Sequence, residues 1–241
     1  MTAFEDKLNK YVDRSNSFTK ELDLKRTVIH ALDIQNLCLS PRGADYVESV
    51  GGAPSGAETL GPARRIIDLA RKKRMKVTWS LWGMHPEGVD LGIFKLKYPS
   101  WKDSESPFNH GTWNGALCDG FAPQKGEPVI KKHRNSSFYG TPFNEYLTED
   151  NAEYLVIVGS STANCVPTTA RDGFDRGFKV IVVADAGTAI PLNSRGRNPK
   201  YDKDTPEGYG QYWEFLRNIQ AQYAEVMSSD EFAALVERSS K

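Results

Sequence analysis

The sequence predicts an α/β fold, a three-layer αβα sandwich around a central, mostly parallel six-stranded sheet, with an extra helix at the N-terminus. Short runs of continuous apolar, often β-branched residues alternate along the chain with amphipathic segments of helical period. Such runs are typical of strands that are buried on both faces of a parallel sheet. The chain has 241 residues, 39% of them hydrophobic, which is enough to bury one sizeable core.

Six segments have the composition of buried strands, because each is a short run dominated by apolar residues, many of them β-branched. They lie at residues 27–33, 76–82, 128–132, 154–159 and 179–185, with a last short strand near 224–227. Crossover connections between parallel strands need helices, and the chain offers one between most of these runs.

The predicted helices follow from apolar spacing and end signals, with Pro62 expected at the start of one helix and Gly177 at the end of another. They cover residues 3–18, 62–73, 141–147, 165–177, 212–223 and 230–238. We expect residues 1–25 to form an N-terminal helical extension and residues 26–241 to form one domain.

Three segments are expected to lack regular structure. They are a Gly/Pro/Ser-rich stretch at 40–61, an aromatic-rich stretch at 83–128 and a polar stretch at 190–211. Long loops in compact domains often carry function. The segment 190–211 is either an exposed loop, or a lid or subunit contact that contributes to substrate recognition.

Composition narrows the classes of function. The 31 Lys and Arg residues balance 31 Asp and Glu residues, which argues against nucleic acid as a partner. No apolar run approaches the length of a membrane span, and the charged first residues resemble no secretory signal. The odd set of cysteines, Cys38, Cys118 and Cys165, indicates reduced thiols and a cytoplasmic location.

Chemistry-bearing residues follow three of the predicted strands. Asp33 ends the first strand, Lys131 and Lys132 end the third, and residues 160–165 follow the fourth. The carboxyl ends of parallel strands meet at one edge of the sheet, where ligands bind. A cysteine at a helix N-terminus, as expected for Cys165, gains thiolate character. Each residue also has an ordinary interpretation, as a buried thiol, a solvated lysine or a turn-capping aspartate.

Three motifs together are more specific than any one residue. They read DIQN at 33–36, KHRNSSFYGT at 132–141 and GSSTANCVPTTARD at 159–172. In this order they resemble motifs of the isochorismatase-like cysteine hydrolase family, closest in kind to biuret and triuret hydrolases, N-carbamoylsarcosine amidases and ureidoacrylate amidohydrolases. The chain departs from the family pattern at Ser137, where alanine is usual, and at Ala163, where Asp or Asn is common.

The resemblance implies a catalytic triad of Asp33, Lys132 and Cys165, and it selects Lys132 over its neighbour. It also implies a cis peptide bond between Ser160 and Ser161. The backbone N–H groups of Ser161 and Cys165 would then form an oxyanion hole for an attacked carbonyl.

Further polar and aromatic residues near the motifs are candidates for substrate binding: Gln35, Asn36, His85 and Phe138. We expect neither a metal nor a cofactor, because the D-x-H element of nicotinamidase metal sites does not follow Asp33 and a lone histidine is a poor metal site.

These observations predict a cysteine-dependent amidohydrolase that cleaves a C–N bond in a small carbamoyl or ureido compound through a thioester. The alternatives are a nicotinamidase-like amidase, an isochorismate-type vinyl-ether hydrolase, which the presence of Cys165 opposes, and a non-catalytic oligomerisation scaffold. The family resemblance implies a homodimer or homotetramer. It also implies that the molecule bound by the protein is a small amide or ureide substrate.

Overall fold

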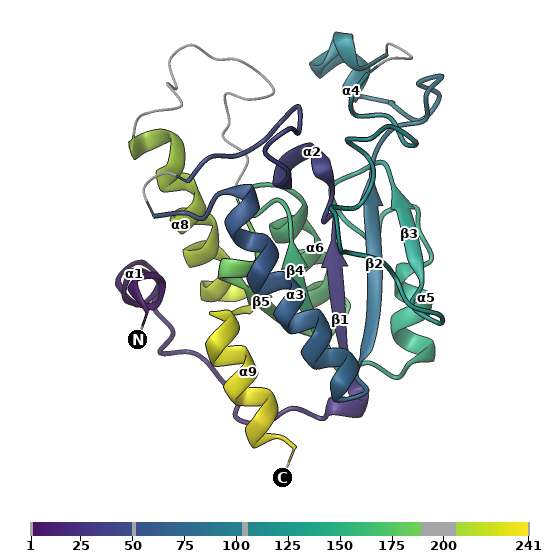
Figure 1. The fold of residues 1–241 in the computed structure, drawn as a ribbon. Coiled ribbons are helices and arrows are strands. Elements are labelled where there is room, and N and C mark those ends of the chain that lie inside the picture. Colours follow the sequence, from purple (N-terminus) through teal and green to yellow (C-terminus); the bar gives the residue numbers. More distant parts are fainter. Residues whose placement is uncertain (1, 50–51, 103–105, 189–205, 241) are drawn as a thin grey trace.

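A computed structural model describes residues 2–49, 52–102, 106–188 and 206–240 (Figure 1). A six-stranded sheet with the strand order β3-β2-β1-β4-β5-β6 lies at its centre. Each pairing between neighbouring strands is parallel. The predicted α/β sandwich is confirmed, and the sheet is parallel throughout.

The strands lie where continuous apolar runs predicted them, within two residues at each end. Their bounds are β1 Thr27–Leu32, β2 Lys76–Trp82, β3 Val129–Lys132, β4 Tyr154–Gly159, β5 Lys179–Val183 and β6 Glu225–Met227. Strand β5 ends earlier than predicted because Ala184–Ala186 form a turn of 3-10 helix.

Helices cover both faces of the sheet. Their bounds are α1 Ala3–Tyr11, α2 Asn36–Leu39, α3 Gly56–Lys72, α4 Phe94–Lys97, α5 Phe143–Glu149, α6 Cys165–Asp175, α8 Pro206–Gln222 and α9 Ser229–Arg238. One apolar cluster joins α3 and α9 to one face of the sheet, and a second joins α5, α6 and α8 to the other. This division produces the three layers.

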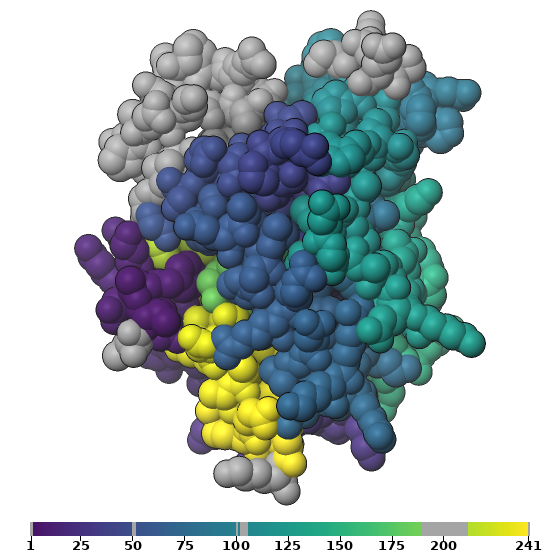
Figure 2. Space-filling model, in the orientation of Figure 1, coloured from purple at the N-terminus to yellow at the C-terminus, as the bar shows by residue number. Residues whose placement is uncertain are grey.

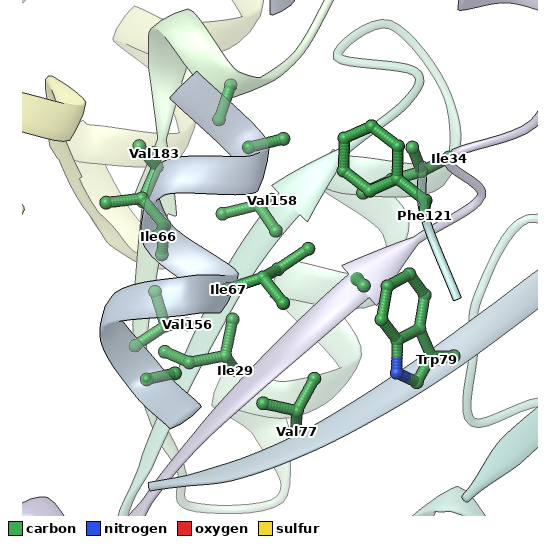
Figure 3. Close-up of a cluster of buried hydrophobic side chains, with 14 of the residues drawn as sticks. Ile29, Ile34, Ile66, Ile67, Val77, Trp79, Phe121, Val156, Val158 and Val183 are labelled. Carbon is green, nitrogen blue, oxygen red and sulfur yellow. The ribbon is translucent and has the colours of Figure 1, made fainter. Parts of the chain in front are cut away.

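The first cluster shows how a helix packs on a parallel sheet. In Figure 3, Ile66 and Ile67 of α3 lie beside Ile29 of β1 and Val156 and Val158 of β4. In the space-filling view, α3 (blue) and α9 (yellow) lie side by side over this face (Figure 2), and the two helices contact each other. These helices cover this face of the sheet, so a site is expected at the edge formed by the carboxyl ends of the strands.

Helix α3 begins at Gly56, six residues before the predicted start, so the prediction of a loop over 40–61 was wrong in its last part. Ser55 is the N-cap, and its side chain and that of Glu58 form a capping box. A capping box supplies the partners that the first N–H groups lack. Pro62 therefore lies inside the helix and does not mark its start.

The N-terminal helix is shorter than predicted, since α1 ends at Tyr11 and the next residue, Val12, has an extended backbone. Phe4 and Tyr11 of α1 contact the ring of Trp213 in α8, and Leu8 is fully buried. The division of the chain at residues 25 and 26 stays a prediction. The segment 190–211 lies outside the described residues up to 205, and from 206 onward it is the first part of α8.

The register of the sheet brings the predicted site residues to one edge. Leu32, the last residue of β1, pairs with Ser80 of β2 and with Gly159 of β4. Lys132, the last residue of β3, pairs with Trp82. The residues that follow β1 and β4 therefore lie at the same edge of the sheet as the end of β3.

Candidate active site

Asp33 leaves β1 in a conformation that is unusual for an aspartate. Its φ is 52°, in the left-handed region that costs most residues energy but that Asp and Asn tolerate best. Its N–H donates to the Ser80 carbonyl at 3.1 Å, and its Oδ1 accepts from the Ser80 hydroxyl at 2.8 Å. The carboxylate is thus fixed by strand β2, and only 6% of the residue is exposed.

Lys132 is the ionic partner of this carboxylate. Its Nζ lies 2.7 Å from Asp33 Oδ2, and the side chain is fully buried. The ammonium also donates to the carbonyls of Arg134 at 3.2 Å and Asn135 at 3.1 Å. Lys131 is exposed, since alternate residues of a strand face opposite sides. Thus only one lysine of the pair reaches the site.

Opposing effects set the charge state of Lys132. Burial alone lowers the pKa of the ammonium, but the negative charges of Asp33 and Cys165 and hydrogen bonds to both outweigh it, so the pKa is raised. Lys132 is therefore a permanent cation at neutral pH. A buried cation is stable only when paired, and this one is placed between a carboxylate and a thiol.

Cys165 is the first residue of α6 and is buried. The N–H groups of a helix's first turn have no carbonyl partner inside the helix and carry partial positive charge. Together with the Lys132 ammonium, they would stabilise the negative charge of a thiolate. This environment is typical of a reactive cysteine.

The connection from β4 to α6 is tight. Gly159 has a φ of 122°, and a Cβ atom there would lie 2.0 Å from the Leu32 carbonyl oxygen. Only glycine permits this approach, in which the Ser160 N–H donates to the same oxygen at 2.8 Å. The peptide bond between Ser160 and Ser161 is cis, as the resemblance implied. Their role as an oxyanion hole stays a prediction.

A small cavity opens in front of these groups. It is lined by residues of the β1–α2 connection, by the end of β2 and by the β4–α6 connection. The described lining residues are Asp33, Gln35, Leu37, Cys38, Trp82, Ser160, Ser161, Asn164 and Cys165. Asp33 and Cys165 therefore share one cavity, with Lys132 buried behind the carboxylate.

Gln35 lines this cavity but its amide is occupied. The Nε2 group donates to the carbonyls of Trp82 at 2.9 Å and Gly115 at 2.8 Å, and Oε1 accepts from the Trp82 N–H at 2.8 Å. A side chain with three bonds to the backbone fixes the wall of the cavity. Its predicted contact with a substrate remains untested.

The other three predicted substrate-binding residues do not belong to the described lining. Asn36 donates its amide to the Trp113 carbonyl at 2.9 Å. His85 is exposed, and its Nδ1 accepts from the backbone of the same turn. Phe138 is buried in the core beside Phe143. Their contact with a substrate stays a prediction.

Sequence reasoning missed Ser80, and it placed Cys38 and Asn164 near the site without assigning either a role. Ser80 is a polar residue within a buried apolar strand, paired in register next to Asp33, and that position could have marked it. Cys38 lies two residues beyond the first motif, and Asn164 directly precedes Cys165. Neither residue type by itself indicates a cavity wall.

A buried histidine lies deeper in the sheet. His30 of β1 shares hydrogen bonds with Thr78 Oγ1 at 2.9 Å through Nδ1 and with Ser137 Oγ at 2.8 Å through Nε2. Burial and the nearby charge of Lys132 lower the pKa of His30 to about 3, despite the opposing effect of Thr78. The ring is therefore neutral at physiological pH and connects β1, β2 and the segment after β3.

The described residues contain neither a candidate metal-binding cluster nor a candidate membrane span. Within residues 2–49, 52–102, 106–188 and 206–240, no group of three or more His, Cys, Asp or Glu side chains is placed to hold a metal ion. In the same ranges, no helix is long and apolar enough to cross a bilayer.

Known proteins resemble this chain in sequence and in fold. The family described as Isochorismatase domain matches residues 27–201. The ureidoacrylate amidohydrolase RutB of Methylobacterium radiotolerans is 32% identical over 179 residues, which is 68% of either chain. Among solved structures, a cysteine hydrolase from Pseudomonas syringae pv. phaseolicola has a TM-score of 0.76 at 22% identity, over 90% of this chain and 95% of that one.

A second solved structure widens the comparison. The N-carbamoylsarcosine amidase of Thermoplasma acidophilum has a TM-score of 0.59 at 23% identity, over 85% of this chain and 97% of its own. At such identities the structures establish the fold, and the family match over 27–201 establishes the relationship. The chain belongs to the isochorismatase-like cysteine hydrolase family.

Proposed function

We propose that the protein is a cysteine-dependent amidohydrolase that cleaves a C–N amide bond of a small carbamoyl or ureido compound. The observation that carries this proposal is the buried Asp33–Lys132 pair, 2.7 Å between charged atoms, beside Cys165 at the wall of one small cavity. Relatives in sequence and fold that are named ureidoacrylate amidohydrolase and N-carbamoylsarcosine amidase support the substrate class.

The first half of the reaction acylates the enzyme. The Cys165 thiol gives its proton to the Asp33 carboxylate, and the thiolate attacks the substrate carbonyl to form a C–S bond. Asp33 then returns the proton to the leaving nitrogen as the C–N bond breaks. Ammonia or an amine departs and a thioester on Cys165 remains.

The second half restores the enzyme. Asp33 accepts a proton from a water molecule, whose oxygen attacks the thioester carbonyl. The C–S bond breaks and the proton returns to the sulfur, which releases a carboxylic or carbamic acid. Lys132 stays protonated throughout and stabilises the negative charge that moves between Asp33 and Cys165.

The backbone N–H groups of Ser161 and Cys165 would stabilise the oxyanion of each tetrahedral intermediate. Cys165 supplies the first N–H of α6, and the Ser161 N–H precedes it in the same turn.

The cellular setting is part of the same proposal. The described cysteines are free thiols, which fits a reducing, cytoplasmic location. We expect the enzyme to work as a homodimer or homotetramer on a small molecule, with neither nucleic acid nor membrane as partner. Light scattering of the purified protein measures the assembly directly.

The experiment measures ammonia release from biuret, triuret, N-carbamoyl amino acids, ureidoacrylate and nicotinamide. We expect turnover of at least one ureide by the wild type and none by Cys165→Ala. Cys118→Ala is the matched control, because burial raises the pKa of the Cys118 thiol to about 12 and that residue lies outside the cavity lining.

A second readout uses the nucleophile itself. Iodoacetamide at neutral pH should alkylate Cys165 and spare Cys118, as peptide mass mapping will show. Ammonia release that survives Cys165→Ala contradicts the mechanism. Pyruvate formed from isochorismate would instead identify a vinyl-ether hydrolase, and an unreactive Cys165 without any turnover would identify a scaffold.

A further inference from the structure

We propose that the Ser161 hydroxyl and the Asn164 carboxamide bind a second, neutral carbamoyl group of the substrate, beyond the carbonyl that Cys165 attacks. This inference rests on the proposed function and deepens it, because it names the polar group that the cavity selects. Both residues line the cavity beside Cys165.

The Ser161 hydroxyl is the first observation. The residue is 2% exposed, and its Oγ has no hydrogen-bond partner among the described residues. A buried hydroxyl without a partner is costly and rare in native proteins. Since Ser161 lines the cavity, a bound ligand is the natural partner for its Oγ.

The Asn164 side chain is the second observation, and it is independent of the first. Asn164 occupies the N-cap of α6, yet its side chain makes no capping hydrogen bond. The N-cap side chains of α1, α3 and α9, namely Thr2, Ser55 and Ser228, all accept a bond from the first helical turn. Asparagine is among the best capping residues, yet this amide is not used for the cap, and Asn164 lines the cavity.

The chemistry of these two groups defines the ligand. A hydroxyl and a carboxamide each donate and accept hydrogen bonds. A carbamoyl group offers both an acceptor oxygen and N–H donors, whereas a carboxylate only accepts and an alkyl chain does neither. None of the described residues that line the cavity is Lys or Arg. A neutral carbamoyl group therefore matches this wall better than a carboxylate.

The test compares two substrates of similar length, biuret, which carries a second carbamoyl group, and butyramide, which has a propyl chain in its place. Ser161→Ala keeps the backbone N–H of the oxyanion hole and removes only the hydroxyl. We expect kcat/KM for biuret to fall about tenfold and kcat/KM for butyramide to change less than twofold. Ser161→Thr, which keeps a hydroxyl, should recover much of the loss.

Asn164→Leu provides the matching test of the second group, with the same selective loss expected for biuret. An equal loss on both substrates, or no loss on biuret, would overturn the proposal for that residue. The melting temperature of Ser161→Ala should equal or exceed that of the wild type, because the variant removes a buried hydroxyl that has no partner. A marked drop in melting temperature would show a structural role instead.

Binding to an inactive enzyme separates this inference from the proposed function. Titration calorimetry with Cys165→Ala should show biuret binding about tenfold more tightly than it binds to the double variant with Ser161→Ala. If the wild type hydrolyses no amide, the proposed function fails, while this binding difference still decides the inference. Tighter binding of N-carbamoylglycine than of biuret would overturn the choice of a neutral group.

Discussion

Replacing Lys132 by methionine tests whether the ion pair at the centre of the site contributes to the stability of the fold as well as to amide hydrolysis. At the observed 2.7 Å from Asp33, two unit charges attract by about 6 kcal/mol at an effective dielectric constant of roughly 20. The cost of burying both charges offsets much of this attraction, so the intact pair contributes little net stability.

Removal of one partner is a different matter. Lys132→Met leaves the Asp33 carboxylate buried, with the Ser80 hydroxyl as its remaining side-chain hydrogen-bond donor among the described residues. An uncompensated buried charge typically costs about 3–5 kcal/mol, and we expect that loss in the free energy of unfolding by urea. Amide hydrolysis should fall by about 100-fold or more, because the cation that stabilises the thiolate is gone.

The stability of the double variant, Lys132→Met with Asp33→Asn, is the decisive measurement. Asparagine tolerates the φ of 52° at this position, and without either charge the burial cost disappears. The double variant should therefore be at least about 1 kcal/mol more stable than the sum of the single losses predicts. Lys131→Met, on the exposed side of the same strand, should change stability by less than about 0.5 kcal/mol. Additive losses in the cycle, or an unchanged urea midpoint for Lys132→Met, would refute the reasoning.

Three further variants test the scaffold. Gly159→Ala should lower the free energy of unfolding by about 3 kcal/mol or more, because its φ is 122° and the new Cβ meets the Leu32 oxygen at 2.0 Å; a wild-type melting temperature would contradict this. The pKa of His30 is about 3 in the folded protein, against 6.5 for an unperturbed histidine. Between these pH values the unfolded chain binds a proton that the folded protein does not. The free energy of unfolding therefore falls as the pH drops from 6.5 toward 3, by about 1.4 kcal/mol per pH unit. His30→Gln should remove that slope in urea titrations, and His85→Gln, at an exposed site, should keep it. Ser55→Ala should cost about 1 kcal/mol through the lost cap and leave turnover unchanged; a loss of turnover would connect α3 to the site.

The sequence predicted most of the sheet because a strand buried on both faces is a local pattern. The run YLVIVG at Tyr154–Gly159 has only one interpretation in a chain of this kind. The start of α3 was harder, since Gly56, Gly61 and Pro62 have the composition of a loop. The capping box of Ser55 and Glu58 was the relevant local signal.

In the candidate site, too, the features set by local sequence were predictable and those set by contacts between distant residues were not. The convergence of Asp33, Lys132 and Cys165 was predictable because parallel strands direct their carboxyl ends to one edge, and the choice of Lys132 over Lys131 came from the family resemblance. The role of the Gln35 amide was not predictable, because its hydrogen-bond partners are far away in the chain. The Gln35 amide bonds to Gly115, 80 residues onward, across the irregular segment whose path no periodicity reveals.

Some polar groups of the cavity are bonded to the backbone and others have no partner among the described residues. This difference determines how substitutions should change substrate preference. The Gln35 amide, bonded on both sides to the backbone, fixes the wall formed by β1 and α2 and has no N–H left to donate to a ligand. The Ser161 hydroxyl keeps its full capacity at a cost to the free protein, which a ligand can recover on binding. Substitutions at Gln35 should therefore disturb all substrates alike, whereas substitutions on the α6 side should change which substrate is preferred.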